Sequence, residues 1–240
     1  MKLGVVIPAY NAAAHIEGVL ERVGGLVASG LTHVVVVDDA SRDDTVQRVR
    51  RYQSRASFRL SLLERPKNGG YGAAMKDGLA AARGDGAELV ACIHADGQYA
   101  PEVLPELIAE LSRQKLDLLQ GSRIAAGTAL QGGMPLYKYV GNMLLNRIEN
   151  HTLRLAMTDY HSGYLLYGRR ALELPFLALS DSFDFDLEVI ASARARGLAV
   201  GEAPIPTHYG DEVSHLNPLT YGMRVLRVMW NYRRGRYDAA

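Results

Sequence analysis

The sequence predicts an α/β fold in which helices flank a mostly parallel sheet. Short apolar runs bounded by turn residues recur at 3–7, 33–37, 58–63 and 88–93, and a segment with helical spacing follows each of them. Regular alternation of strand and helix is typical of a parallel sheet. The chain has 240 residues, of which 48% are hydrophobic, and this is enough to bury the core of one such domain.

Strict alternation of strand and helix ends near residue 118, and further elements of both kinds follow. We expect residues 1–240 to form a single domain. The four earlier helices are expected at 13–27, 44–51, 71–82 and 101–114, the later strands at 118–123, 164–167 and 199–203, and the later helices at 136–155, 183–195 and from 218 onward.

Composition argues against several classes of function and location. The formal net charge is +1 with both signs interspersed, so we expect no nucleic-acid partner. Cys92 lies in an apolar run, which favours a buried and inert thiol. The first residues resemble a strand rather than a secretory signal, and no apolar run reaches the roughly eighteen residues of a membrane span. We therefore expect a cytoplasmic protein whose membrane contact, if any, is peripheral at the inner face.

In an open α/β sheet the ligand binds beyond the carboxyl ends of the strands, so the residues there are the first candidates. Pro8 and Tyr10 follow the first strand, and Asp38 and Asp39 follow the second. A single aspartate at such a place is more often a helix cap, as Asp44 is expected to be. Two adjacent carboxylates favour a ligand role instead, because one of them can accept hydrogen bonds from ribose hydroxyls or a base N–H.

The fourth strand leads into His94, Asp96 and Gln98. If the backbone stays extended, these alternate side chains lie on one side. Imidazole, carboxylate and amide oxygen suit Mn²⁺, and Mg²⁺ where phosphate oxygens complete the coordination. A solvated turn after the strand explains the same residues equally well.

A glycine-rich segment at 68–74, which includes Gly70, opens the helix after the third strand. Such a helix start suits a phosphate, although a glycine turn without ligand remains an alternative. The segment matches neither the P-loop pattern nor a dinucleotide-binding fingerprint.

Together these motifs resemble family 2 of the inverting glycosyltransferases, and within it the dolichyl- and polyprenyl-phosphate hexosyltransferases. The resemblance covers nearly the whole chain. It is carried by the residues at 7–11, 37–45, 68–74, 94–99 and 121–123.

The resemblance implies a GT-A fold, a Rossmann-like α/β/α sandwich, in which residues 1–124 bind the nucleotide sugar and residues 125–240 bind the acceptor. Pro8, Tyr10 and Asp39 would line the nucleoside pocket, and Gly70 and Arg123 would lie near the rest of the donor. Asp96 and Gln98 would hold a divalent metal, Mn²⁺ or Mg²⁺, on the diphosphate. His94 stands where the family usually has an aspartate.

Two later segments bear on the acceptor. Asp159 lies in a segment, 158–164, that resembles the acceptor-side motif of the family, so it is our candidate base for a hydroxyl acceptor. An acceptor phosphate is already ionised, so Asp159 would need only to orient it. Alternatively, Asp159 is a turn residue without a role in catalysis. His161 is expected to be packed or solvent-facing. His215 replaces the usual phosphate-binding lysine and is expected to donate to the diphosphate.

The segment 221–236 mixes apolar residues with five arginines. It suits a helix at a membrane interface. Alternatively, its apolar side packs on the domain or on a second subunit, which would make a homo-oligomer.

The sequence thus predicts a metal-assisted enzyme that moves a hexose from a UDP- or GDP-sugar to a polyprenyl phosphate or another lipid-linked or glycan acceptor. A nucleotidyltransferase is a weaker alternative, because the first strand lacks a glycine- and lysine-rich loop. The other alternative is a subunit or scaffold that binds a nucleotide sugar but has weakened catalytic activity.

Overall fold

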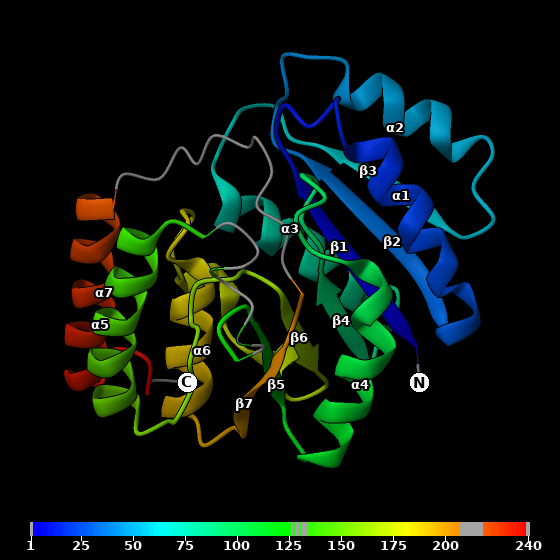
Figure 1. Cartoon of the computed structure of the whole chain (residues 1–240). Coiled ribbons are helices and arrows are strands. Elements are labelled where there is room, and N and C mark those ends of the chain that lie inside the picture. The colour runs from blue at the N-terminus through cyan, green and yellow to red at the C-terminus, as the bar shows by residue number, and fades with distance from the viewer. Residues whose placement is uncertain (1, 126, 128–129, 131–133, 207–217, 239–240) are drawn as a thin grey trace.

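The computed structural model describes residues 2–125, 127, 130, 134–206 and 218–238. Seven strands form one sheet in the order β3-β2-β1-β4-β6-β5-β7 (Figure 1). Neighbouring strands are parallel except where β6 pairs with β4 and β5. The strands are β1 (Leu3–Ala9), β2 (Leu31–Asp38), β3 (Leu60–Glu64), β4 (Leu89–Cys92), β5 (Leu118–Ser122), β6 (Leu165–Gly168) and β7 (Val200–Pro204).

The helices lie where the apolar spacing predicts them, with ends that differ by a few residues. The expected first helix is shorter than predicted and continues as a 3₁₀ turn over Gly25–Ser29. The α-helices are α1 (Ile16–Gly24), α2 (Thr45–Gln53), α3 (Tyr71–Gly84), α4 (Leu104–Arg113), α5 (Leu136–Leu153), α6 (Phe185–Ala195) and α7 (Pro218–Arg233).

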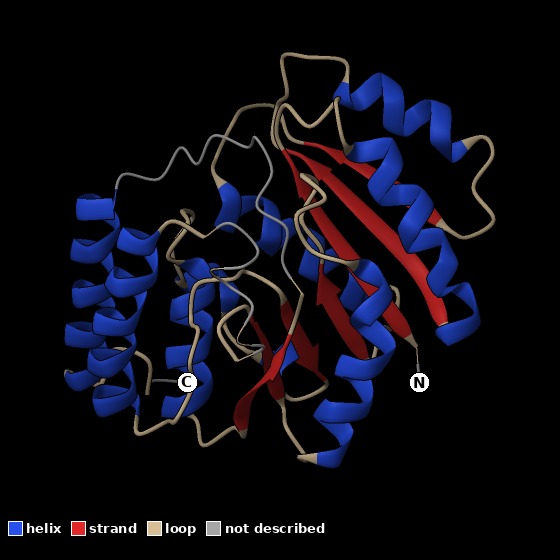
Figure 2. Ribbon diagram, in the orientation of Figure 1, coloured by secondary structure: helices blue, strands red, loops and turns tan. Residues whose placement is uncertain are grey.

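Helices cover both faces of the sheet, so the fold has three layers (Figure 2). Along β2, Val34 and Val36 belong to the core beneath α1, α2 and α4, whereas Val35 and Val37 belong to the core beneath α3 and α6. All four valines are fully buried. A continuous apolar run is what a strand covered on both faces requires.

The outer helices α5 and α7 lie side by side at one end of the molecule (Figure 1). α7 packs against both α5 and α6. No helix within the described part of the chain is both long enough and apolar enough to cross a membrane.

The close approach of α3 to the sheet depends on Gly78. A Cβ atom there would lie 2.3 Å from Cγ1 of Val6 on β1, whose short branched side chain has no room to move aside. We expect Gly78→Ala to lower the free energy of unfolding by about 1–3 kcal/mol, measured by urea denaturation. The matched control is Gly84→Ala at the end of α3, where a Cβ atom meets nothing within 4 Å. Equal effects of the two substitutions would contradict this packing account.

Candidate functional site

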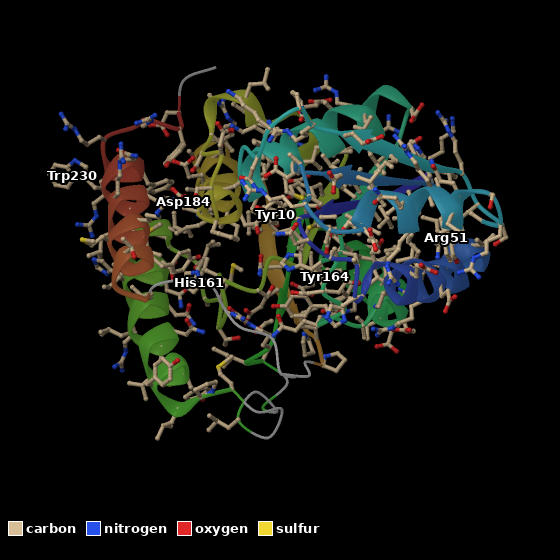
Figure 3. All side chains as sticks on the ribbon, turned by 90° about the horizontal axis from the view of Figure 1, so that it is seen from above. Tyr10, Arg51, His161, Tyr164, Asp184 and Trp230 are labelled. Carbon is tan, nitrogen blue, oxygen red and sulfur yellow. The ribbon has the colours of Figure 1, made fainter. Side chains whose placement is uncertain are left out.

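The loops after β1 and β2 form one unit at the carboxyl edge of the sheet. Ala9 pairs with Asp38 in the sheet, so Tyr10 and Asp39 emerge together. The Asn11 backbone N–H donates to Ser41 Oγ (2.9 Å) and links the two loops. Tyr10 is 46% exposed, and Figure 3, which looks onto this edge, shows it near the middle of the molecule. Pro8 is half-buried beside it. An exposed aromatic ring at this edge offers a flat surface to a base.

Asp39 holds the glycine-rich loop in place. Its carboxylate accepts hydrogen bonds from the backbone N–H groups of Gly69 (2.9 Å) and Gly70 (2.7 Å), and it pairs with Arg65 Nη1 at 2.6 Å. The side chain is almost fully buried. The structure thus gives Asp39 a clamping role that the sequence did not suggest.

Gly70 contacts protein in the place where the sequence predicted a phosphate. Its φ of +97° is favoured only for glycine, and a Cβ atom there would lie 2.5 Å from the Asp181 carbonyl oxygen. That carbonyl also accepts a hydrogen bond from the Ala73 N–H (3.2 Å) in the first turn of α3. Asp39 and the Asp181 carbonyl therefore accept the backbone N–H groups at the start of α3. The glycines there allow the backbone before α3 to approach the backbone at Asp181 closely.

The segment after β4 does not stay extended, so the predicted one-sided row of His94, Asp96 and Gln98 is wrong. The chain turns at Ala95 and Asp96, and Gly97 has a φ of +75°. Asp96 Oδ1 accepts the N–H of Gln98 (3.0 Å), which closes the turn. Within the described residues, no three His, Cys, Asp or Glu side chains gather into a metal-binding group.

His94 is packed among aromatic rings. Its ring makes edge contacts with Tyr71 and Tyr99, at centroid distances of 5.7 and 5.4 Å. A Cβ atom on Gly163 would lie 2.6 Å from His94 Nε2, so this edge of the ring abuts the backbone of Gly163. Burial lowers the pKa of His94, which keeps the imidazole neutral. These contacts pack His94 between two tyrosine rings and the backbone of Gly163.

The structure joins two predicted site residues, Arg123 and Asp159, in one buried ion pair. Arg123 Nε and Nη2 lie 2.6 and 2.9 Å from the two carboxylate oxygens of Asp159. Asp159 is 0% exposed, and it also accepts the backbone N–H of His161 (2.9 Å). Burial acts to raise the pKa of Asp159, but the Arg123 guanidinium and His161 together outweigh it, so the pKa is lowered.

The loop that carries Asp159 is fixed on both sides. Glu202 on β7 accepts the backbone N–H groups of Thr158 (2.7 Å) and Asp159 (3.3 Å). The His161 side chain is only 6% exposed, which agrees with the packed alternative of the sequence prediction. Its Nδ1 lies 3.0 Å from the Tyr221 hydroxyl, and its Nε2 lies 3.3 Å from Glu149. His215 lies outside the described residues, so its predicted role stays a prediction.

Asp186 on α6 is a titratable residue near the site that sequence reasoning missed. Its Oδ2 accepts a hydrogen bond from the Tyr71 hydroxyl (2.8 Å). The same oxygen would lie 3.3 Å from a Cβ atom on Gly163, so Asp186 and His94 both lie next to Gly163. Burial raises the pKa of Asp186 to about 7. The only signal in the sequence is the alternation of aromatic and acidic residues at 183–186, which does not reveal that α6 faces this edge.

A family model described as glycosyl transferase family 2 matches residues 4–174. The chain belongs to glycosyltransferase family 2. The matched residues run from β1 past β6 and include Asp39, Asp96, Arg123 and Asp159. The family expected from the motifs is thereby confirmed.

Relatives of this family 2 chain include several hexosyltransferases. The low-salt glycan biosynthesis hexosyltransferase Agl6 of Haloferax volcanii is 31% identical over 95% of the chain, which spans only 52% of that relative. The UDP-N-acetylglucosamine–dolichyl-phosphate N-acetylglucosaminyltransferase of Methanococcus voltae is 28% identical, with 85% of each sequence covered. The polyprenol monophosphomannose synthase of Mycolicibacterium smegmatis is 29% identical, and the match covers 98% of this chain and 89% of that relative.

Solved structures confirm the GT-A fold. Glucosyl-3-phosphoglycerate synthase from Mycobacterium tuberculosis, in complex with Mn²⁺, UDP and phosphoglyceric acid, superposes with a TM-score of 0.69 at 19% identity. The superposition covers 96% of this chain and 78% of that one.

We expect the Asp186 carboxyl to make the stability of this family 2 chain pH-dependent. Its pKa is about 7 in the folded protein, against an ordinary value of 3.8 for an aspartate, so the folded state holds the proton more tightly. The resulting stabilisation is complete below about pH 4 and is lost as the pH rises through about 7, by up to about 4 kcal/mol. Asp186→Asn cannot ionise and should lack this loss in urea denaturation. Parallel stability curves for the wild type and the variant would show that another group is responsible.

Proposed function

We propose that this chain transfers a hexose from a UDP- or GDP-sugar to a polyprenyl phosphate, with inversion at the anomeric carbon. The names of its relatives support a lipid-phosphate acceptor, because they include polyprenol monophosphomannose synthase and dodecaprenyl-phosphate galacturonate synthase. The likeness to a fold that binds UDP supports a nucleotide-sugar donor. In this assignment residues 1–124 serve the donor and residues 125–240 serve the acceptor.

The state of Asp159 is the observation that carries the choice of acceptor. A hydroxyl acceptor needs a base, and a base needs a reachable oxygen and a pKa near the working pH. Asp159 is fully buried, both its oxygens face Arg123, and its pKa is lowered. A phosphate acceptor is already ionised and needs no base. We therefore assign Asp159 to the positioning of Arg123, in preference to the role of base.

Arg123 is the residue we assign to phosphate recognition. Its guanidinium is fixed on one edge by Asp159, and the Arg123 backbone N–H donates to the same carboxylate (3.2 Å). A guanidinium held in this way loses little conformational entropy when it binds an anion. Asp159 therefore prepares Arg123 for a phosphate, from either the donor or the acceptor.

The donor base is assigned to the surface formed by Pro8 and Tyr10. Asp39, which was expected to touch the nucleoside, supports this surface indirectly, because it clamps the loop at 69–70 to the end of β2. The proposed nucleoside contacts are thus the exposed ring of Tyr10 and the backbone around it.

We assign a divalent metal to Asp96 and Gln98, which the turn after β4 holds next to each other. Mg²⁺ and Mn²⁺ are commonly held by one or two carboxylates while substrate phosphates and water complete the shell, so a lone half-buried carboxylate is a sufficient anchor. When bound, the metal would neutralise charge on the departing diphosphate. His94 is assigned to packing instead, because its Nε2 edge abuts Gly163.

The proposed place of action is the cytoplasmic face of a membrane. A polyprenyl phosphate is held in the bilayer, so an enzyme without its own described span has to approach the lipid surface. Cys92 is a buried free thiol, which suits a reducing compartment.

A matched pair of acceptors tests this function. We expect labelled sugar to pass from UDP-glucose, UDP-N-acetylglucosamine or GDP-mannose into polyprenyl phosphate in detergent with Mn²⁺, and not into the free polyprenol. The extracted product is counted, and the proton coupling at its anomeric carbon reports inversion. Asp159→Asn should lower kcat by about tenfold or more, because Arg123 loses its charged partner. Transfer to the polyprenol at an equal rate would contradict a phosphate-specific site.

A further inference from the structure

Exposed apolar side chains gather on the outer helices α5 and α7. Thirteen large hydrophobic side chains are exposed in the described part of the chain, and eight of them lie on these two helices. Isolated exposed apolar residues need no explanation, but a cluster of this kind marks an interaction site. We call this cluster the α5–α7 face; it comprises Leu136, Tyr137, Val140, Met143, Leu144, Met223, Leu226 and Trp230.

α7 is apolar on two sides, and only one of them is explained by the fold. Val225, Val228 and Met229 are buried against the rest of the domain. Leu226 and Trp230 point the other way, and Trp230 is 60% exposed. Figure 3 shows Trp230 directed outward at the edge of the molecule. A helix that only packed on the domain would carry polar residues on this outer side.

The α5–α7 face is also basic. The sequence has no Asp or Glu at 134–148 or at 218–237. Arg147, Arg227, Arg233 and Arg234 are exposed there, and the Arg234 guanidinium lies 5.7 Å from the centre of the Trp230 ring. Aromatic, aliphatic and arginine side chains in one face are the composition of helices that lie in a lipid interface.

We propose that the α5–α7 face docks on the surface of an anionic lipid bilayer. Its apolar side chains would enter the boundary between headgroups and acyl chains, and its arginines would meet the lipid phosphates. The proposal rests on the proposed function, since an acceptor held in a membrane requires such a contact, and it assigns that contact to two helices rather than to the C-terminal helix alone.

Charge distinguishes a bilayer from a second copy of the chain as the occupant. A two-fold dimer through this face would bring the exposed arginines of both copies together, and segments 134–148 and 218–237 hold no acidic residue to compensate them. Such like-charge contacts oppose association. Anionic lipid supplies the missing negative charge.

The inner side of the two helices contacts the loop that carries Asp159. Glu149 of α5 and Tyr221 of α7 both contact His161, which is two residues from Asp159. A bilayer on the outer side of α5 and α7 would therefore lie one helix layer away from the Arg123–Asp159 pair. This short path suits the delivery of a lipid phosphate to Arg123.

Co-sedimentation with vesicles tests the proposal on the full chain. We expect binding to vesicles of phosphatidylcholine with phosphatidylglycerol, weakened by salt, and little binding to phosphatidylcholine alone. Leu144→Ser with Trp230→Ser should remove most of the binding. The matched control is Leu177→Ser, because Leu177 is 88% exposed but lies outside the α5–α7 face.

A second pair of variants isolates the charge. Arg233→Gln should weaken binding about fivefold, whereas Arg51→Gln, at the opposite end of the molecule from Trp230 (Figure 3), should leave it unchanged. All five substituted positions are exposed, so thermal unfolding should be the same for every variant.

Three results would overturn the proposal: equal binding to both kinds of vesicle, unchanged binding by the double variant, or a dimer in light scattering that the double variant dissociates. Titration with UDP and GDP runs in parallel and separates the two hypotheses. Vesicle binding without nucleotide binding would refute the proposed function and leave the docking face supported, and the reverse result would refute the docking face alone.

Discussion

The buried ion pair between Arg123 and Asp159 is the interaction on which the second half of the site depends. Arg123 follows β5, Asp159 precedes β6, and Glu202 on β7 holds the backbone of the Asp159 loop. Three neighbouring strands thus meet at one charge pair. Removing one partner of such a pair leaves a buried charge without compensation, which typically costs about 3–5 kcal/mol. We therefore expect this half of the sheet to keep its geometry only when both Arg123 and Asp159 are present.

A second carboxylate organises the other half in the same way. Asp39 satisfies the N–H groups at the start of α3 and pairs with Arg65. The favourable position for an anion at a helix start is thus occupied by a side chain of the protein itself. The exposed ring of Tyr10 and the half-buried carboxylate of Asp96 are among the groups that stay accessible at this edge in the described part of the chain. These are the groups that a nucleoside and a metal-bound diphosphate need.

The sequence was sufficient to predict the fold, because apolar runs and helical spacing recur with little ambiguity. The antiparallel placement of β6 was not predictable in this way, since its apolar run looks like that of its neighbours. The extended backbone predicted for residues 94–98 was wrong for a local reason: Gly97 has a positive φ, and the Asp96 side chain closes a turn with the Gln98 N–H. Arg123 and Asp159 were both found as candidates, but their pairing depends on contacts between residues 36 positions apart. Asp186 lacked any local motif and is brought to the site only by the packing of α6.

Calorimetric titration shows whether this edge of the sheet binds a nucleotide with the help of a metal. UDP and GDP would be titrated with Mn²⁺, with Mg²⁺ and with EDTA, into the wild type and into Asp96→Ala. We expect one nucleotide to bind in the presence of metal, and we expect EDTA or the substitution to weaken this binding by about tenfold or more. Binding of neither nucleotide, or equal binding by the wild type and Asp96→Ala with and without metal, would contradict it.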